Sequence, residues 1–179
     1  MFRRMGELLV EAGELSADEL RDIIEEQQRV YRPFGRIAAS RFQVTEAAIW
    51  RAWAAQYACY CPRVDINREE RDVTVQPFLS ASEAMQRLML PLRYHDGDLV
   101  VVTADAALSA ALQYVDRQTS GADAVVLWLA DDAHALVEAI GRAYGLPAAE
   151  VRLRQKELRS AESAPDSGPA SPPSEPEAA

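Results

Sequence analysis

The feature that most constrains this 179-residue chain is an internal repeat between Arg4 and Gln56. One spacing of glycine, apolar residues and glutamine occurs twice, with an offset of 29 positions. The first copy contains Arg4, Met5, Gly6, Leu9, Gly13, Leu20, Ile24 and Gln27, and the second contains Pro33, Phe34, Gly35, Ala38, Phe42, Ile49, Trp53 and Gln56. The repeat predicts two copies of one structural unit that pack together.

Each copy is predicted to be a helical hairpin. Apolar residues between positions 5 and 12 recur at the spacing of an amphipathic helix, and Gly13 suits a left-handed helix cap. Ser16, with Glu19 three residues later, is typical of a capping box that starts a second helix. Thr45 takes the position of Ser16 in the second copy. The predicted unit is therefore helix, tight corner, helix.

The second half of the chain is predicted to be mixed, so that the fold class is α+β. Residues 1–67 would form the tandem helical-hairpin half and residues 68–147 the α+β half of the same domain. Asp96-Gly97 is a strong signal for a two-residue hairpin turn, because both positions tolerate positive φ. The predicted order is a helix at 80–88, strands at 89–94 and 98–103, a helix at 106–117, a strand at 124–129 and a helix at 132–144 that Gly145 ends.

The C-terminal part changes in composition. Residues 148–159 are charged and predict a helical extension. Residues 160–179 contain half of the chain's ten prolines among Ser, Ala and Glu. Such a segment buries too little apolar surface to offset its ordering entropy, so a disordered acidic tail is expected.

Charge and motifs argue against several functions. A formal net charge of -9 argues against DNA or RNA binding, which usually needs a clustered basic face. The chain has no P-loop and no dinucleotide-binding G-x-G-x-x-G sequence. His134 follows two aspartates, but a solvated helix start explains it better than catalysis. Cys59 and Cys61 are expected to be reduced thiols, since no further ligands accompany them for a metal. We expect no enzymatic activity, no metal and no cofactor.

The tandem motif resembles the N-terminal, MshEN-type domain of type II secretion and type IV pilus assembly ATPases. The five residues between the two copies match the spacing in that family. Later features support the resemblance over residues 3–146: Val64-Asp65-Ile66, Leu90-Pro91-Leu92, Asp105 and Tyr144-Gly145. Domains of this type also occur attached to bacterial glycosyltransferases.

The resemblance implies a site for cyclic di-GMP, which some members of the family bind. Gly6 and Gly35 would let backbone N–H groups approach a phosphate, and Arg4 would stack on a guanine or pair with a phosphate. Gln27 and Gln56 would bond base edges or brace the helix corners. The implied nucleotide-binding residues are Arg4, Met5, Gly6, Leu9, Gly13, Leu20, Ile24, Gln27, Phe34, Gly35, Ile49, Trp53 and Gln56. Two duplicated hairpins with no ligand would produce the same repeat.

The second copy departs from the family pattern at two positions. Phe42 stands where a glycine is expected, and a bulky residue in left-handed geometry costs about 1 kcal/mol or more, so that corner would be reshaped. Ala38 replaces a leucine, which removes packing of about 2 kcal/mol unless the site collapses. The larger Trp53 is expected to fill that gap. Whether the second half-site still binds ligand is open at this point.

The resemblance also implies a role without catalysis. We expect a regulatory or adaptor module in the bacterial cytoplasm, recruited to the inner-membrane face by a partner and not inserted itself, because no long apolar run occurs. The partner would belong to a secretion, pilus or glycosyltransferase machinery. The alternative is a protein–protein docking domain that has lost nucleotide binding, which Phe42 in the ligand cleft would favour.

Overall fold

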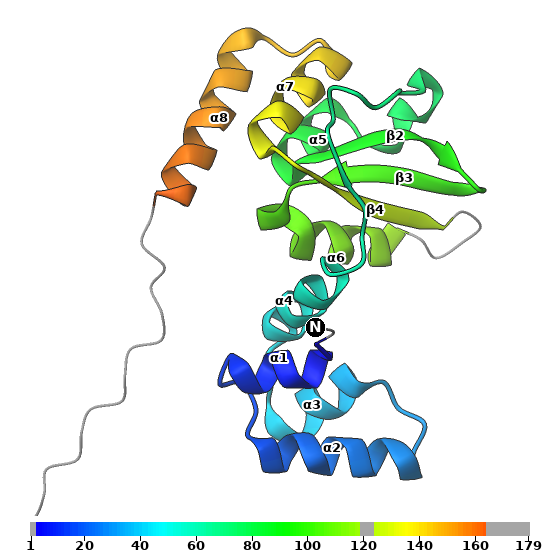
Figure 1. The fold of residues 1–179 in the computed structure, drawn as a ribbon, viewed down its shortest axis with the longest axis vertical. Helices are drawn as coiled ribbons and strands as arrows, with labels where there is room; N and C mark the ends of the chain where they lie inside the picture. Colours follow the sequence, from blue (N-terminus) through cyan, green and yellow to red (C-terminus); the bar gives the residue numbers. More distant parts are fainter. Residues whose placement is uncertain (1–2, 119–123, 164–179) are drawn as a thin grey trace, which may run out of the picture.

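The computed structural model describes residues 3–118 and 124–163. It consists of a helical part, here called the hairpin lobe, and a part built on a β-sheet, here called the sheet lobe (Figure 1). The hairpin lobe contains α1 (Met5–Glu11), α2 (Ala17–Arg29), α3 (Phe34–Phe42) and α4 (Glu46–Tyr57). The sheet lobe contains β1 (Arg63–Val64), η1 (Val73–Phe78), α5 (Ala81–Arg87), β2 (Met89–His95), β3 (Asp98–Thr103), η2 (Asp105–Ala107), α6 (Leu108–Gln118), β4 (Val125–Ala130), α7 (Ala133–Tyr144) and α8 (Ala148–Glu162). The predicted α+β class is confirmed.

The two hairpins keep the offset of the sequence repeat. α1 and α3 begin 29 residues apart, and so do α2 and α4. Ser16 Oγ accepts the Glu19 N–H at 3.2 Å, and Thr45 Oγ1 accepts the Ala48 N–H at 3.2 Å, so that both second helices begin with a side-chain cap. α1 packs along α4 and α2 along α3, which interlocks the two copies.

The two corners differ in which residue takes the left-handed conformation, because the second copy has Phe42 in place of a glycine. Gly13 takes the left-handed conformation in the first corner, with φ 70°. Phe42 remains helical as the last residue of α3, and Gln43 becomes the left-handed residue with φ 56°. The second corner is therefore reshaped, and the strained position lies one residue later than the repeat indicates.

Backbone hydrogen bonds nevertheless close both corners alike. The Leu9 carbonyl oxygen accepts hydrogen bonds from the N–H groups of Glu14 and Leu15, at 2.9 and 3.3 Å. The carbonyl oxygen of Ala38, the equivalent of Leu9, accepts hydrogen bonds from the N–H groups of the equivalent residues, Gln43 and Val44. The path of the chain is thus preserved although the residue with positive φ has moved.

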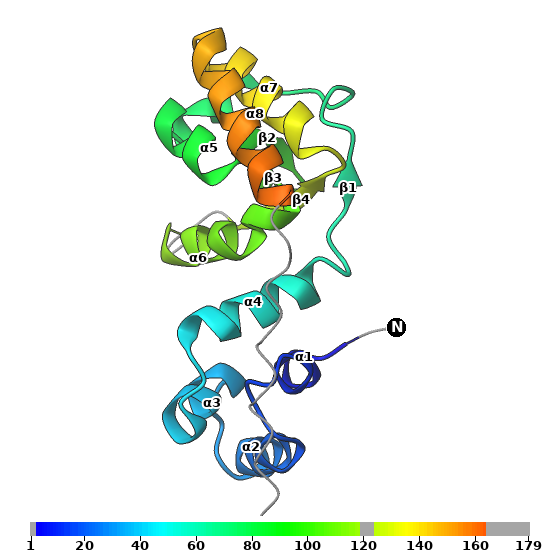
Figure 2. The same ribbon diagram turned by 90° about the vertical axis from the view of Figure 1, so that its left-hand side faces the viewer.

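The sheet has the strand order β1-β4-β3-β2. β4 is parallel to both β1 and β3, and β2 is antiparallel to β3. Asp96 and Gly97 have φ of 52° and 92°, which confirms the predicted hairpin turn. In Figure 2, α6 lies on one face of the sheet and α5 and α7 on the other. The η1 segment that packs beside β2 was not predicted.

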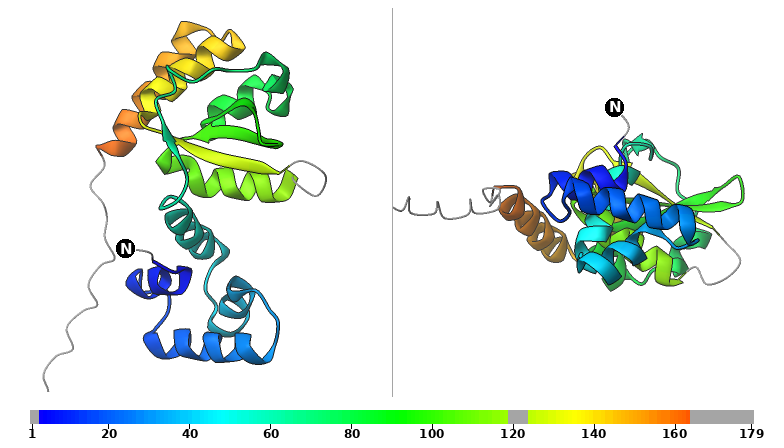
Figure 3. Two further views of the ribbon diagram at one scale, coloured as in Figure 1. Left: turned by 45° about the vertical axis from the view of Figure 1, so that its right-hand side comes forward. Right: turned by 90° about the horizontal axis from the view of Figure 1, so that it is seen from below.

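Two separate apolar clusters occupy the lobes. The hairpin cluster is formed by Leu9, Leu15, Ile23, Ile37, Ala38, Val44, Ala48 and Ala52. The sheet cluster surrounds both faces of the sheet, and Ala54 is its first member along the chain. α4 therefore serves both clusters, and Figure 3 (left) shows it between the two lobes. The predicted boundary at residue 67 stays a prediction, and the clusters themselves meet within α4.

α8 runs back along α7 after the turn at Gly145, which has φ 64° as the helix cap. It continues to Glu162, so the first residues assigned to the predicted tail are helical, and residues 164–179 of that tail lie outside the described residues. Among the helices that the structure describes, none is long and apolar enough to cross a membrane.

Candidate functional site

The candidate site lies in the hairpin lobe, where the two motif glycines hold helices together. A Cβ on Gly6 would collide with Leu20 Cδ1 and lie 3.2 Å from Phe34 Cζ. A Cβ on Gly35 would lie 3.0 Å from Ile49 Cγ2. Leu20 and Ile49 are equivalent positions of the repeat, so each hairpin seats a branched side chain of its second helix on the glycine of its first. The structure therefore gives both glycines a packing role.

The first turns of α1 and α3 lie next to each other. The contact between Gly6 and the Phe34 ring joins them, and Figure 1 shows both helices beginning on the same side of the lobe, near the C-terminal end of α2. A cavity of about 370 Å³ lies where the end of α2 connects to α3, lined by Gln27, Tyr31, Arg32 and Pro33. Its volume is within the range of small-molecule sites.

Polar groups of the first motif copy are available at this side of the lobe. Arg4 precedes α1 and is exposed, and its backbone N–H donates to Glu7 Oε2 at 2.9 Å. Its guanidinium makes no ion pair with any residue that the structure describes. Gln27 Nε2 donates to the Arg32 carbonyl oxygen at 3.2 Å, so this glutamine braces the connection between the hairpins. Ile24, one helical turn before Gln27, is 44% exposed.

Other members of the predicted set do not line this cavity. Leu9 is 1% exposed and belongs to the hairpin cluster, so it supports the lobe from inside. Gly13 lies beyond the opposite end of α1, in the corner. Four further members, which are Met5, Leu20, Phe34 and Ile49, are partly buried. Whether any of the thirteen predicted residues contacts a nucleotide stays a prediction.

The second copy contributes differently from the expectation. Ala38 is completely buried in the hairpin cluster. Trp53 does not fill the space beside it, because Trp53 packs against the sheet cluster, with its ring 4.8 Å from that of Trp50. Gln56 is partly buried on the same C-terminal half of α4. This half of the helix has been recruited to the contact between the lobes.

Phe42 does not block the opening. It packs on the hairpin cluster at the C-terminal end of α3, about 10 Å along the helix from Gly35. The Arg41 guanidinium lies over its ring, at 5.2 Å from the centroid. Phe42 in the cleft would have favoured the loss of the ligand site, and Phe42 does not lie there.

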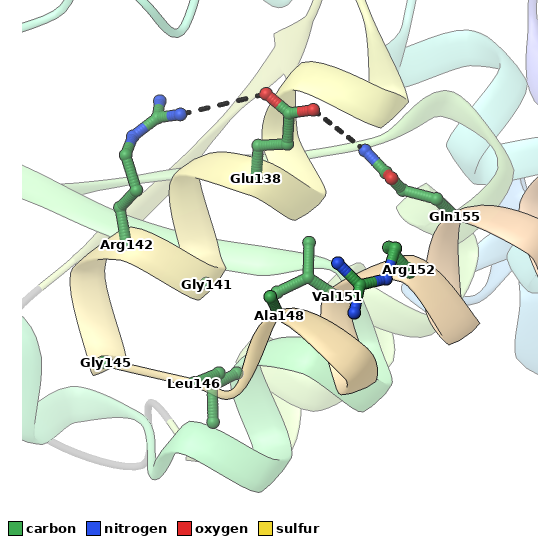
Figure 4. Close-up of a pocket in the computed structure, with 9 residues that line it drawn as sticks. All are labelled: Glu138, Gly141, Arg142, Gly145, Leu146, Ala148, Val151, Arg152 and Gln155. Atoms are coloured by element: carbon green, nitrogen blue, oxygen red, sulfur yellow. Dashed lines mark hydrogen bonds and ion pairs between the residues drawn. The ribbon is translucent and has the colours of Figure 1, made fainter.

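Sequence reasoning did not find a second cavity, which lies between α7 and α8. It measures about 530 Å³, and Val151 of α8 and Gly141 of α7 are both part of its lining (Figure 4). Glu138 accepts a hydrogen bond from Gln155 at 3.1 Å and pairs with Arg142 at 3.8 Å. The signal in the sequence was Gly141, because a glycine in the middle of a predicted helix often marks a close packing contact.

The chemistry available elsewhere is limited. Cys59 and Cys61 are free thiols, and burial raises the pKa of the Cys61 thiol, which keeps it protonated at neutral pH. Within residues 3–118 and 124–163, no three His, Cys, Asp or Glu side chains come together in a way that could hold a metal ion.

Comparison with known proteins identifies the class. The family model of the MshEN domain matches residues 59–150, which are 92 of the 179 residues. The chain belongs to the MshEN domain family. The matched region covers the sheet lobe and ends before most of α8, and the tandem motif lies N-terminal to it.

The chain is also similar to solved structures. One is a structure of MshE with cdg, with a TM-score of 0.42, 24% identity, 79% of this chain covered and 99% of that chain. Another is the N-terminal domain of XpsE, with a TM-score of 0.39, 20% identity, 81% of this chain covered and 100% of that chain. No curated protein matches.

Proposed function

We propose that the hairpin lobe binds cyclic di-GMP and that the chain is a regulatory module without catalytic activity. The observation that carries the proposal is the tandem motif, whose two copies fold into equivalent hairpins with the starts of α1 and α3 in contact. A cyclic dinucleotide consists of two equivalent halves, so two equivalent hairpins offer matching halves of a site. Membership in the MshEN family supports the same ligand class.

The chemistry of the opening suits such a ligand. The unpaired guanidinium of Arg4 offers a charge-assisted contact to a phosphate or a stacking surface for a guanine. Exposed Ile24 and the cavity at Gln27 offer apolar surface next to a side-chain amide. Such a combination of apolar walls with a few polar groups is typical of ligand sites.

Isothermal titration of the full chain with cyclic di-GMP tests the proposal, with GMP as the control ligand that has one base and one phosphate. We expect saturable binding of cyclic di-GMP at tens of micromolar or below and much weaker binding of GMP. Absence of heat up to that range would overturn the proposal.

The competing function is a docking domain that binds only protein. The packing roles of Gly6 and Gly35 favour it, because they explain both glycines without a ligand. The same titration separates the two, since a pure docking domain gives no heat with the nucleotide.

We further infer that the partner belongs to a secretion, pilus or glycosyltransferase machinery and that it recruits the chain to the inner-membrane face from the cytoplasm. The support is the family resemblance, and α4 offers a physical route, because it is shared by both apolar clusters. Co-purification of the tagged chain with such an assembly, stronger with nucleotide than without it, is the expected result.

A further inference from the structure

Tyr31 is presented to solvent by a rigid turn. Its side chain is fully exposed, although it is a large aromatic residue. The Arg32 N–H donates to the Val30 carbonyl oxygen at 2.7 Å across Tyr31, which is the pattern of a γ-turn. Gln27 fixes the Arg32 carbonyl oxygen from the other side, and Pro33 then leads into α3. One backbone hydrogen bond, one side-chain hydrogen bond and a proline thus restrain the backbone that presents the ring.

The same turn forms the wall of the cavity at the candidate site. Tyr31 and Arg32 line it together with the motif residue Gln27 and with Pro33. Arg32 is exposed, and its guanidinium has no ion-pair partner among the described residues. An aromatic face and an unpaired guanidinium beside one cavity are the two groups that recognise a base and a phosphate.

The sequence repeat extends to these two residues. With the offset of 29 positions, Tyr31-Arg32 corresponds to Phe2-Arg3, so that each motif copy is preceded by an aromatic residue and an arginine. Neither residue is needed to start a helix or to fill the hairpin cluster, because Tyr31 and Arg32 are exposed. Arg3 of the first copy pairs with Glu11 of α1 at 2.7 Å, whereas Arg32 has no such partner among the described residues, so helix packing does not explain the second pair.

We propose that Tyr31 stacks on a purine base of the bound dinucleotide and that Arg32 pairs with its phosphate. This inference rests on the proposed function and adds two residues that the motif does not include. The hydrogen-bonded turn lowers the conformational cost of stacking, because the backbone on which the ring is mounted is already restrained in the free protein.

Titration of the full chain with cyclic di-GMP tests the inference with four variants. Tyr31→Ala is expected to weaken binding about tenfold or more, which is the usual effect of losing one base–aromatic stack. Tyr31→Phe keeps the ring and should stay within about threefold of the wild type. Arg32→Ala should weaken binding and reduce its dependence on salt concentration. Tyr94→Ala removes a half-exposed tyrosine of β2 and is the control, with unchanged affinity.

The outcomes separate the two proposals. If the wild type binds and Tyr31→Ala binds equally well, this inference is overturned while the proposed function stands. If the wild type does not bind, the proposed function fails and the stacking role fails with it. Thermal melting of Tyr31→Ala should equal that of the wild type, because the side chain makes no packing contact in the cluster. An upfield shift of the Tyr31 ring protons on adding nucleotide would identify stacking directly.

Discussion

At the scale of single residues, the two corners show how one backbone path tolerates different sequences. Gly13 adopts φ 70° without a side chain, whereas Gln43 adopts φ 56° with one. For a residue other than glycine, left-handed geometry costs about 1 kcal/mol. The second copy therefore carries a strain that the first copy avoids.

Opposite effects are expected from substitutions at the two positions. Gly13→Ala should lower the free energy of unfolding by about 1 kcal/mol, because a Cβ at positive φ is strained even though no atom lies within 4 Å of it. Gln43→Gly should raise it by up to about 1 kcal/mol, less the added entropy of the unfolded chain. Urea unfolding of both variants checks the signs. Destabilisation by Gln43→Gly would show that its side chain makes an essential contact.

Arg4 allows binding and stability to be separated. Arg4→Ala should weaken cyclic di-GMP binding by about 1–3 kcal/mol if its guanidinium makes a charge-assisted contact. The melting temperature without ligand should hardly change, because the exposed guanidinium has no ion-pair partner in the described part of the chain. A variant that melts much lower and whose melting does not respond to ligand would mark Arg4 as structural.

At the scale of elements, local signals predicted the fold and long-range contacts decided the rest. The Ser16 and Thr45 caps and the Asp96-Gly97 turn depend on neighbours within three residues, so the sequence was sufficient. The placement of Tyr57 against Leu127, 70 positions away, has no local signal. Helical spacing likewise predicts which residues share one face of a helix, but it does not predict which element packs against that face.

The candidate site illustrates the same limit. Motif spacing selected Leu9 and Gln27 equally, yet Leu9 lies in the hairpin cluster and Gln27 at the opening. Trp53 was expected inside the hairpin lobe, but its ring packs on the sheet lobe. Tyr31 lies in the connection between the two motif copies, and its full exposure is visible only in the structure.

The packing of α8 on α7 depends on a close contact between Gly141 and Val151. A Cβ on Gly141 would lie 2.5 Å from Val151 Cγ2, and valine has little freedom to rotate away. Gly141→Ala should therefore loosen α8 and cost about 1–3 kcal/mol, despite the better helix propensity of alanine.

A double-mutant cycle supplies the control for that prediction. Val151→Ala removes the two methyl groups that meet the new Cβ, so the Gly141→Ala, Val151→Ala double variant should be more stable than the sum of the single effects predicts. Thermal unfolding of the four proteins measures the coupling, and hydrogen exchange in α8 locates it. Strict additivity would show that the two residues do not meet.

The start of α5 predicts a dependence on pH. Ser80 Oγ donates to Glu83 Oε2 at 2.6 Å and the Ser80 N–H donates to the same oxygen at 3.0 Å, and these bonds hold the pKa of the Glu83 carboxyl below its ordinary value of 4.5. A lowered pKa in the folded state gives stability that is present above pH 4.5 and lost as the pH falls through the folded pKa. Glu83→Gln should melt lower than the wild type at pH 7, and the two melting curves should converge in acid. A constant difference across that range would exclude the linkage.

At the scale of the whole molecule, α4 makes the two lobes one structure. Ala48 and Ala52 face the hairpin cluster, whereas Ala54 and Trp53 belong to or pack on the sheet cluster. The Tyr57 hydroxyl donates to the Leu127 carbonyl oxygen at 3.2 Å and accepts the Leu127 N–H at 3.1 Å, beside the short β1. α4 therefore offers a physical route from the hairpins to the central sheet.

Two fragments test this arrangement, because the matched MshEN region begins at residue 59, just after α4. Residues 44–163 should fold stably, since the side of α4 that loses its partners carries one large apolar residue, Ile49, beside the small Ala48 and Ala52. Residues 59–163 should be less stable by several kcal/mol, because each large apolar side chain such as Trp53 contributes about 1.5–3 kcal/mol when buried and Leu127 also loses its hydrogen-bond partner Tyr57. Urea unfolding compares the two. Equal stability would mean that the sheet lobe is complete without α4 and that signals from the hairpin lobe must pass by another route.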